Sequence, residues 1–266
     1  MIKPRDIRFP FDAALEADWN GGDWFRTAFF NAMSILFPYG EKSFIDSVRA
    51  NEFAATTPAL KAAVRGFMAQ EYVHRREHQR FNELLCEARG YSLDWLEATI
   101  RGDSEELQNL DPLFWLATTV AYEHLTATIA GCLLGRADWL DGADAGVAKV
   151  WRWQAIEEIE HKSVAFDVFI AAGGTRAMLR KAMLLMSFEF LFRFQARSLW
   201  HMYRRDRPPL GRTLVQAGRF LFGRRGLIFG NWRHYWAFFR SDFHPDHIDD
   251  TAILTRAIEA EGLAHA

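Results

Sequence analysis

The stretch QEYVHRREH, residues 70–78, presents a carboxylate and two imidazoles on one face of a helix. Because an α-helix turns by about 100° per residue, Glu71, His74 and His78 project the same way. Phe67 and Phe81 continue this face, which is typical of a buried stripe. Burying these polar groups among phenylalanines is costly unless each has a partner, and a divalent metal is a partner for all of them. The stretch therefore indicates a metal site inside a helical core.

A second segment, residues 157–167, repeats the Glu-x-x-His spacing at Glu158 and His161. Single glutamates, Glu41 and Glu123, lie inside two other apolar helical segments. Two Glu-x-x-His pairs and two single glutamates, contributed by four helices, are the ligand set of a ferritin-like di-iron or di-manganese bundle. We therefore predict six metal ligands: Glu41, Glu71, His74, Glu123, Glu158 and His161.

Other polar residues on these helices have two interpretations. Glu157 and Glu160 flank Glu158, so the spacing leaves open which of the three binds metal. We expect the two flanking glutamates, together with Glu77 and His124, to be solvated.

Three residues are predicted to take part in catalysis: His78, Tyr72 and Tyr122. His78 can alternatively be a ligand or a buried histidine paired with a carboxylate. Asp167 is expected to support a ligand by a hydrogen bond.

The hydrophobic spacing predicts an all-α fold, a ferritin-like four-helix bundle with a fifth long helix and shorter C-terminal covering helices. The bundle helices are predicted over 23–51 with a break at 37–40, then 56–90, 104–134 and 143–172, followed by the fifth helix over 178–200 and covering helices over 212–222 and 229–239. Gly90 and Gly173 are predicted stop signals. The expected organisation is a lead-in at 1–22, the bundle at 23–204 and a basic, aromatic C-terminal part at 205–266.

Composition bounds the class of protein. The chain has 266 residues, of which 50% are hydrophobic and 25% charged, enough for a real core. Its two cysteines, Cys86 and Cys132, have no disulfide-like spacing, and the N-terminus has no apolar signal segment. We expect a cytoplasmic protein.

Charge is distributed unevenly along the chain. Residues 176–240 hold thirteen Arg and one Lys against Glu189 and Asp206, a balance of +12, although the net charge is only -2. This segment is expected to meet either the acidic bundle or an anionic membrane as a peripheral contact. Charges interrupt 178–200 too often for a membrane span. A small, partly apolar substrate and a homodimer are the other expected partners, and no nucleic acid is expected.

Four motifs occur in order along the chain: Phe37-Pro38-x-Gly40-Glu41-x-x-Phe44-Ile45, Glu71-x-x-His74-x-x-x-His78, Glu157-Glu158-x-Glu160-His161-Lys162-x-Val164-Ala165-Phe166-Asp167 and Phe243-His244-Pro245. As an ordered set they resemble a bacterial family catalogued as predicted metal-dependent hydrolases. The resemblance extends over about 29–249 and implies a helical, ferritin-like metalloprotein.

The chemistry of the ligands leaves three functions open. An oxygen-rich set suits two metal ions, with iron as first choice and manganese or zinc as alternatives. The favoured hypothesis is an oxidoreductase that uses O₂ to oxidise a small, partly apolar substrate. The alternatives are a hydrolase that uses a metal-activated water, as the family resemblance implies, and a non-catalytic metal-binding or interaction protein.

Overall fold

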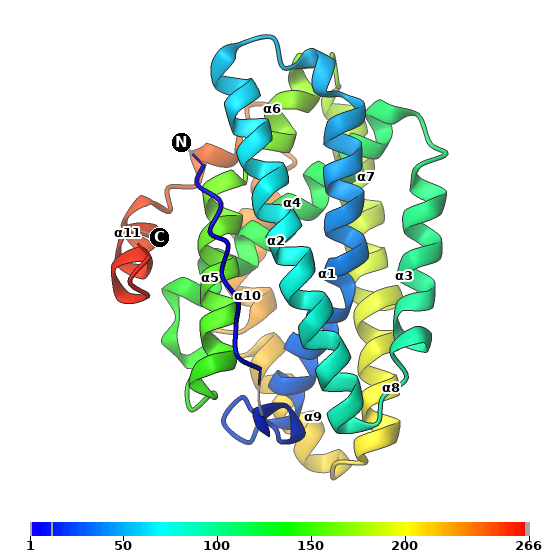
Figure 1. Cartoon of the computed structure of the whole chain (residues 1–266), viewed down its shortest axis with the longest axis vertical. Helices are drawn as coiled ribbons and strands as arrows, with labels where there is room; N and C mark the ends of the chain where they lie inside the picture. Colours follow the sequence, from blue (N-terminus) through cyan, green and yellow to red (C-terminus); the bar gives the residue numbers. More distant parts are fainter. Residues whose placement is uncertain (1, 12, 264–266) are drawn as a thin grey trace.

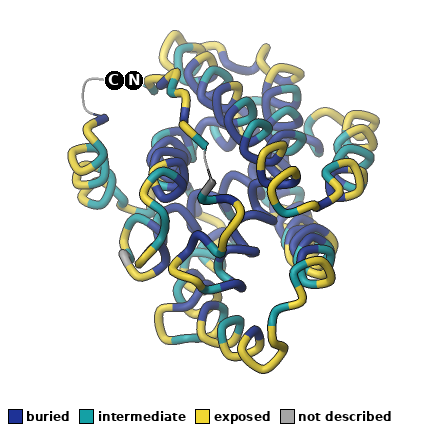
Figure 2. Tube along the Cα trace, turned by 60° about the horizontal axis from the view of Figure 1, so that its bottom comes forward, coloured by how far each residue is buried: buried dark blue, intermediate teal, exposed yellow. Residues whose placement is uncertain are grey.

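Four helices surround the larger hydrophobic core: α1 (Trp24–Ala50), α2 (Pro58–Arg89), α4 (Pro112–Gly135) and α5 (Ala145–His161). The structure, a computed structural model, describes residues 2–11 and 13–263, and this part of the chain contains no β-strand (Figure 1). Buried residues are concentrated on the inner part of the molecule, and exposed ones on its outside (Figure 2). The predicted all-α class is confirmed.

Helix α1 differs from its prediction because it runs through Pro38 without a break. A proline inside a helix cannot bond the carbonyl four residues earlier, here that of Ser34. The Asn82 side chain of α2 replaces that bond, with its amide nitrogen 2.9 Å from the Ser34 carbonyl oxygen. Glu41 therefore lies in the middle of a continuous helix and is 1% exposed, rather than capping a new helix.

Helix α2 begins and ends where its sequence signals predict. The Thr57 hydroxyl accepts a hydrogen bond from the Leu60 amide at 3.2 Å, and Pro58 opens the helix. Gly90 closes it with a φ of 64°, in the left-handed region. The ends of the longest rod in the bundle are thus determined locally.

Two other predicted helices have different bounds. The connection after α2 holds a helix, α3 (Leu93–Leu107), and α4 starts only at Pro112, because the Asp111 side chain caps it. The predicted helix over 143–172 is split into α5 and α6 (Val164–Ala171). At the split, the Lys162 ammonium bonds the Ile248 carbonyl at 2.6 Å, which ties the turn to the C-terminal segment.

The predicted fifth helix is a composite rod. It consists of α7 (Arg176–Phe188), a π-helical segment η4 (Glu189–Gln195) and α8 (Ala196–Asp206). It packs on α4 and α1 and is followed by α9 (Leu210–Phe222) and α10 (Leu227–Ala237). None of the helices in the described ranges is long and apolar enough to cross a bilayer.

The termini of the described chain lie against α2 and α5. The N-terminal segment runs along these two helices (Figure 1), where Arg5 and Phe9 are buried. It leads into a short 3-10 turn, η1 (Ala13–Glu16). The C-terminal helix α11 (Thr251–Ala260), which the sequence did not predict, packs on α4 and α5. Other 3-10 turns are η2 (Glu52–Ala54), η3 (Ala137–Trp139) and η5 (Pro245–His247).

Candidate metal centre

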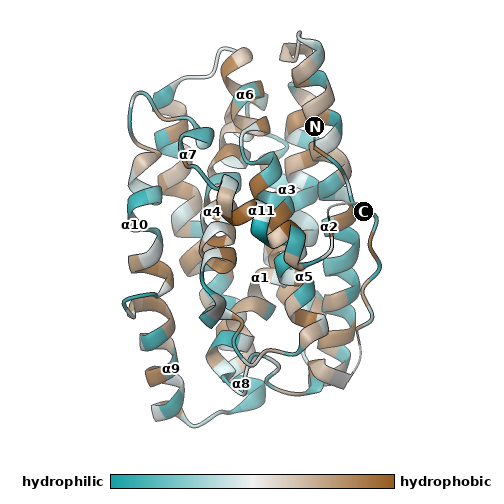
Figure 3. Ribbon diagram, turned by 90° about the vertical axis from the view of Figure 1, so that its left-hand side faces the viewer, coloured by the Kyte–Doolittle hydropathy of each residue, from teal (hydrophilic) through white to brown (hydrophobic). Residues whose placement is uncertain are grey.

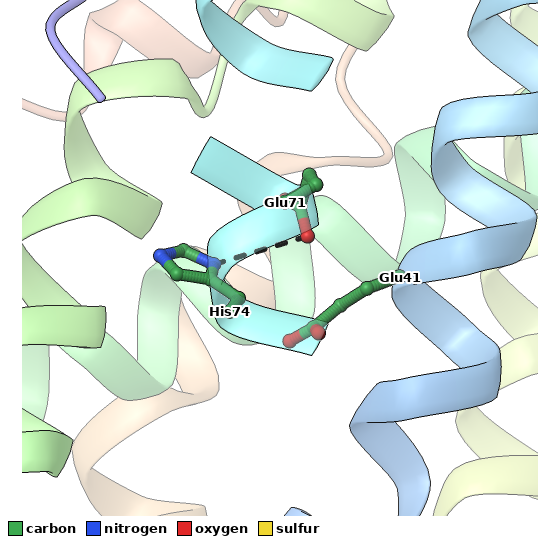
Figure 4. Close-up of side chains that lie close together, drawn as sticks. All are labelled: Glu41, Glu71 and His74. Atoms are coloured by element: carbon green, nitrogen blue, oxygen red, sulfur yellow. Dashed lines mark ion pairs between the residues drawn. The ribbon is translucent and has the colours of Figure 1, made fainter. Parts of the chain in front are cut away.

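The six predicted ligands converge from four helices. Glu41 comes from α1, Glu71 and His74 from α2, Glu123 from α4, and Glu158 and His161 from α5, and none of the six is more than 5% exposed. Glu41 reaches from α1 toward the pair on α2 (Figure 4). Local helical spacing explains each pair, and the packing of the bundle brings the pairs together.

Glu71 and Glu158 each extend between the two imidazoles. On one side, His74 Nδ1 lies 3.8 Å from Glu71 Oε2 and 3.7 Å from Glu158 Oε1. On the other side, His161 Nε2 lies 3.1 Å from Glu71 Oε1 and 3.6 Å from Glu158 Oε2. Each carboxylate therefore offers one oxygen to each histidine, as a bridging ligand does.

The remaining two glutamates lie at opposite ends of this arrangement. Glu123 Oε2 is 3.4 Å from His161 Nε2. Glu41 groups instead with Glu71 and His74, their ligand atoms all within 4.8 Å of one another. A second such group consists of Glu71, Glu123 and His161. The cluster thus divides into two halves that share Glu71.

Seven of the atoms that face the centre have no hydrogen-bond partners. They are Glu41 Oε2, both carboxylate oxygens of Glu71 and of Glu123, His74 Nδ1 and His161 Nε2. Buried polar atoms are nearly always bonded, and leaving one unpaired costs about 1–3 kcal/mol. So many unpaired acceptor and nitrogen atoms around one point fit a site for metal cations, which bind such atoms directly.

Each histidine is oriented by a hydrogen bond at its other ring nitrogen. His74 Nε2 lies 3.1 Å from Glu157 Oε2, and His161 Nδ1 lies 2.9 Å from Gln70 Oε1. Glu157 is itself held by the indole of Trp153 and the guanidinium of Arg5, both at 3.1 Å. Such partners fix the ring tautomer and leave the inward nitrogen free to bind metal.

His78 faces a neighbouring hydrogen-bond chain instead of the ligand atoms. Its Nδ1 is 2.8 Å from the Ser34 hydroxyl and its Nε2 contacts the Gln154 amide oxygen. Gln154 in turn donates to Glu41 Oε1 at 3.2 Å and Glu158 Oε1 at 3.1 Å. Burial lowers the pKa of His78 to about 3. Both ring nitrogens of His78 are therefore engaged by Ser34 and Gln154, and its predicted role as a ligand or catalytic group stays a prediction.

The two tyrosines predicted to be catalytic do not reach the centre. Tyr72 is 61% exposed, because the residue after Glu71 projects about 100° away from it on the helix. Tyr122 is buried, and for the same reason it turns away from the predicted ligand Glu123 and lines an apolar cavity between α1, α3, α4 and η4.

Several residues expected to be solvated are buried. Glu157 lies 3.1 Å from His74 Nε2. Glu77 accepts hydrogen bonds from Arg76 at 2.8 Å and Arg80 at 2.7 Å, and from the Phe9 amide at 3.1 Å, which anchors the N-terminal segment. His124 is 3% exposed and bonds the His234 carbonyl. These polar side chains therefore bond other parts of the folded chain, which the spacing within one helix cannot reveal.

The other two acids from the sequence prediction lie away from the ligands. Glu160 pairs with Arg5 at 2.7 Å, so Glu158 is the member of the glutamate trio that faces the centre. Asp167 lies 2.9 Å from His244 Nε2 rather than beside a ligand.

The carboxylates and imidazoles of the cluster shift one another's pKa. Burial raises the pKa of Glu41 and Glu123 well above the usual range, with neighbouring Glu71 acting in the same direction. Burial also opposes ionisation of Glu71, but contacts with His161 and His74 outweigh it and lower its pKa to about 2. Burial disfavours charged His74 and His161, yet the surrounding carboxylates hold the pKa of both well above the usual value. Without other cations, protons on these imidazoles neutralise part of the carboxylate charge.

Replacing Gln70 tests the orienting contacts. Gln70→Ala removes the acceptor for His161 Nδ1, and we expect metal affinity to fall by about 10–100-fold because the ring loses its fixed tautomer and orientation. Gln79→Ala, on the same helix but bonded to Glu83 away from the cluster, should leave affinity unchanged. Competition with a chromophoric chelator measures both values. Equal affinities would contradict the role of Gln70.

Comparison with known proteins gives one match. A family model described as predicted metal-dependent hydrolase matches residues 3–249. Neither the curated proteins nor the solved structures contain a match. The match supports metal dependence, which agrees with the carboxylate and histidine groups described above.

The same match corrects the predicted chemistry. The sequence-based preference for O₂-dependent oxidation by an oxidoreductase is wrong, because the family description names hydrolysis. The ligand set alone could not make this choice, since carboxylate and histidine ligands serve both reactions. From its match over nearly the whole length, the chain belongs to the family of predicted metal-dependent hydrolases.

Proposed function

We propose that the cluster binds two divalent metal ions and hydrolyses an ester or amide bond in a small, partly apolar substrate. The observation that carries the proposal is the division of Glu71 and Glu158 between two otherwise unpaired imidazole nitrogens. Glu41 and His74 would complete one metal site, and Glu123 and His161 the other. An oxygen-rich set of this kind suits manganese or iron, and zinc is the third candidate.

Two metal ions would supply a water of lowered pKa and polarise the scissile carbonyl. The protein residues supply the geometry. Gln154 holds Glu41 Oε1, so that Oε2 faces the centre, and it also holds Glu158 Oε1. The Thr126 hydroxyl donates to Glu158 Oε2 at 2.6 Å. These contacts fix carboxylate orientation before substrate binds, which reduces the reorganisation required during the reaction.

Aromatic side chains limit the entry of water. The Phe67 ring packs edge-on to His161, with ring centroids 5.0 Å apart, and Trp153 packs edge-on to His74 at 4.8 Å. A low-dielectric surrounding strengthens the interaction between the carboxylates and a developing charge. The apolar cavity lined by Gly40, Tyr122 and Thr126 lies next to the ligands and is the natural place for an apolar part of the substrate.

Reconstitution tests the proposal. Chelated protein would be reloaded separately with Mn²⁺, Fe²⁺ under nitrogen, or Zn²⁺, and metal content and hydrolysis of aryl esters and amides of increasing acyl length measured. We expect two equivalents of metal per chain and hydrolysis that depends on the loaded metal, with chelated protein and Glu158→Ala as inactive controls. A reloaded protein that binds less than one equivalent, or hydrolyses no faster than the chelated protein, would refute the proposal.

A further inference from the structure

The C-terminal helices expose an unusual amount of apolar surface. On the composite rod, α9 and α10, many large apolar side chains are 51–64% exposed, and they include Phe188, Phe192, Leu214, Phe222, Trp232 and Trp236. We call these six residues and the surface around them the exposed apolar face. In α9 the buried residues are Thr213 and Phe220, while Leu214 and its apolar neighbours point to solvent. Contiguous exposed apolar surface usually marks a contact with a partner or a membrane.

Basic side chains accompany this face. Residues 176–240 have a balance of +12, and both acids among them already have internal contacts. Glu189 lies 3.4 Å from Arg193, and Asp206 accepts hydrogen bonds from Trp24 and Tyr91. Arg224 and Arg225, in the turn between α9 and α10, are exposed. The face therefore combines apolar side chains with positive charge, because residues 176–240 contain too few acids to neutralise their own arginines.

The helices that carry the face are neighbours. Helices α9 and α10 follow one another along one edge of the molecule (Figure 3), and they are in contact. Between α10, η4 and α4 lies an apolar groove of about 380 Å³, lined by Leu191, Trp232 and Trp236 among others. This volume falls within the range of ligand pockets.

The groove leads toward the metal centre. Leu125, Ile129 and Phe190 line both this groove and a narrow inner cavity of about 40 Å³. Thr126 lines the inner cavity and bonds the ligand Glu158. A thin wall of shared side chains, one of them on the π-helical segment, therefore separates the groove from the inner cavity. π-Helical turns frequently occur at functional sites.

We propose that the exposed apolar face docks on an anionic lipid membrane, and that the groove receives an acyl chain of a lipid ester or amide on its way to the metal centre. The second part rests on the proposed hydrolase function, whereas the first does not. The narrow inner cavity selects a slender chain over a ring.

The charge distribution favours a membrane over a second copy of the chain as the occupant. A symmetric dimer would place this arginine-rich face against itself, which is repulsive. At an anionic bilayer, tryptophan and phenylalanine side chains enter the interface while arginines reach the headgroups. Each basic residue near such a surface contributes about 1 kcal/mol of attraction, roughly fivefold in affinity.

Vesicle sedimentation tests docking without depending on activity. The full chain, loaded with metal or chelated, would be mixed with phosphatidylcholine vesicles with or without phosphatidylglycerol, at low and high salt. We expect binding only to the anionic vesicles, weaker at high salt, and equal for both forms of the protein. Arg224→Glu/Arg225→Glu and Leu214→Ser/Phe222→Ser should each weaken binding by at least about tenfold.

Matched variants outside the face serve as controls. Lys61→Glu/Arg65→Glu reverses two exposed charges on α2, and Phe53→Ser removes a side chain that is 77% exposed. Both should bind vesicles like the wild type. Equal binding by face and control variants would overturn the docking proposal, as would failure to bind anionic vesicles. Dimerisation that is lost in the face variants, without vesicle binding, would assign the face to a second copy.

A separate measurement tests the acyl-chain path. Ile129→Trp should place a larger side chain between the groove and the inner cavity and obstruct the path between them. Binding of a monomeric lysophosphatidylglycerol, measured by calorimetry, should fall by at least about tenfold. Vesicle docking by this variant should persist, which shows that it is folded. Unchanged lysolipid binding would refute the path, and loss of hydrolysis alone would not affect either result.

Discussion

His74→Ala/His161→Ala should carry less than about a tenth of the metal bound by the wild type. Each substitution removes one of the two unpaired nitrogens around which the carboxylates are arranged. The remaining glutamates retain their negative charge, but each half of the site then lacks its histidine. Since metal binding and a preformed ligand geometry are coupled, we expect the loss to be nearly complete.

The matched control for the double variant is His124→Ala. His124 is also buried, at 3% exposed, but it bonds the His234 carbonyl away from the cluster. Elemental analysis should find wild-type metal in this control, and circular dichroism should show helical structure in both proteins. Wild-type metal content in the double variant would rule out these histidines as ligands.

The second large effect concerns stability. Glu123→Gln should stabilise the metal-free protein by about 1–3 kcal/mol and destabilise the metal-loaded one. Neither Glu123 oxygen has a hydrogen-bond partner, and Glu71 and Glu158 are nearby carboxylates. Without metal, a neutral amide avoids the cost of ionising this buried carboxyl beside Glu71 and Glu158. With metal, the same substitution removes a ligand, and excess metal at 100–1,000 times Kd contributes roughly 3–4 kcal/mol to the wild type.

The pH dependence of the metal-free protein has a definite sign. Because burial raises the folded-state pKa of Glu41 and Glu123, their contribution to stability is fully present below about 4.5 and is lost as pH rises through the raised values. Glu71, with its pKa lowered to about 2, contributes the opposite slope at lower pH, between about 4.5 and 2. Glu123→Gln should reduce the loss of stability that the metal-free protein shows as pH rises above about 4.5.

Urea unfolding of both proteins, with and without metal, measures these differences. Tyr72→Phe is a suitable control because its side chain is exposed and outside the cluster. A lower stability of metal-free Glu123→Gln would contradict the claim that the Glu123 carboxyl lacks a hydrogen-bond partner.

The clustering of the six side chains could be predicted from sequence because helical spacing is a local property. Glu71 and His74, like Glu158 and His161, lie one turn apart, and each pair must share a face once its helix forms. The same rule should have excluded Tyr72 and Tyr122, since each adjoins a ligand in the chain and must therefore point elsewhere.

The orienting residues could not be predicted because they depend on packing between helices. Gln70 and Gln154 are neutral amides with no sequence signal, and Glu157 looked like a solvated acid. Arg5 and Glu157 are 152 positions apart in the chain, and only the assembled bundle brings them into contact. Continuity of α1 through Pro38 likewise depends on Asn82 of another helix.

Anomalous X-ray diffraction at the absorption edge of the bound metal tests the central claim most directly. The account predicts two peaks about 3.5–4 Å apart between Glu71 and Glu158, one beside His74 Nδ1 and the other beside His161 Nε2. A single peak, or peaks bound elsewhere in the chain, would contradict it.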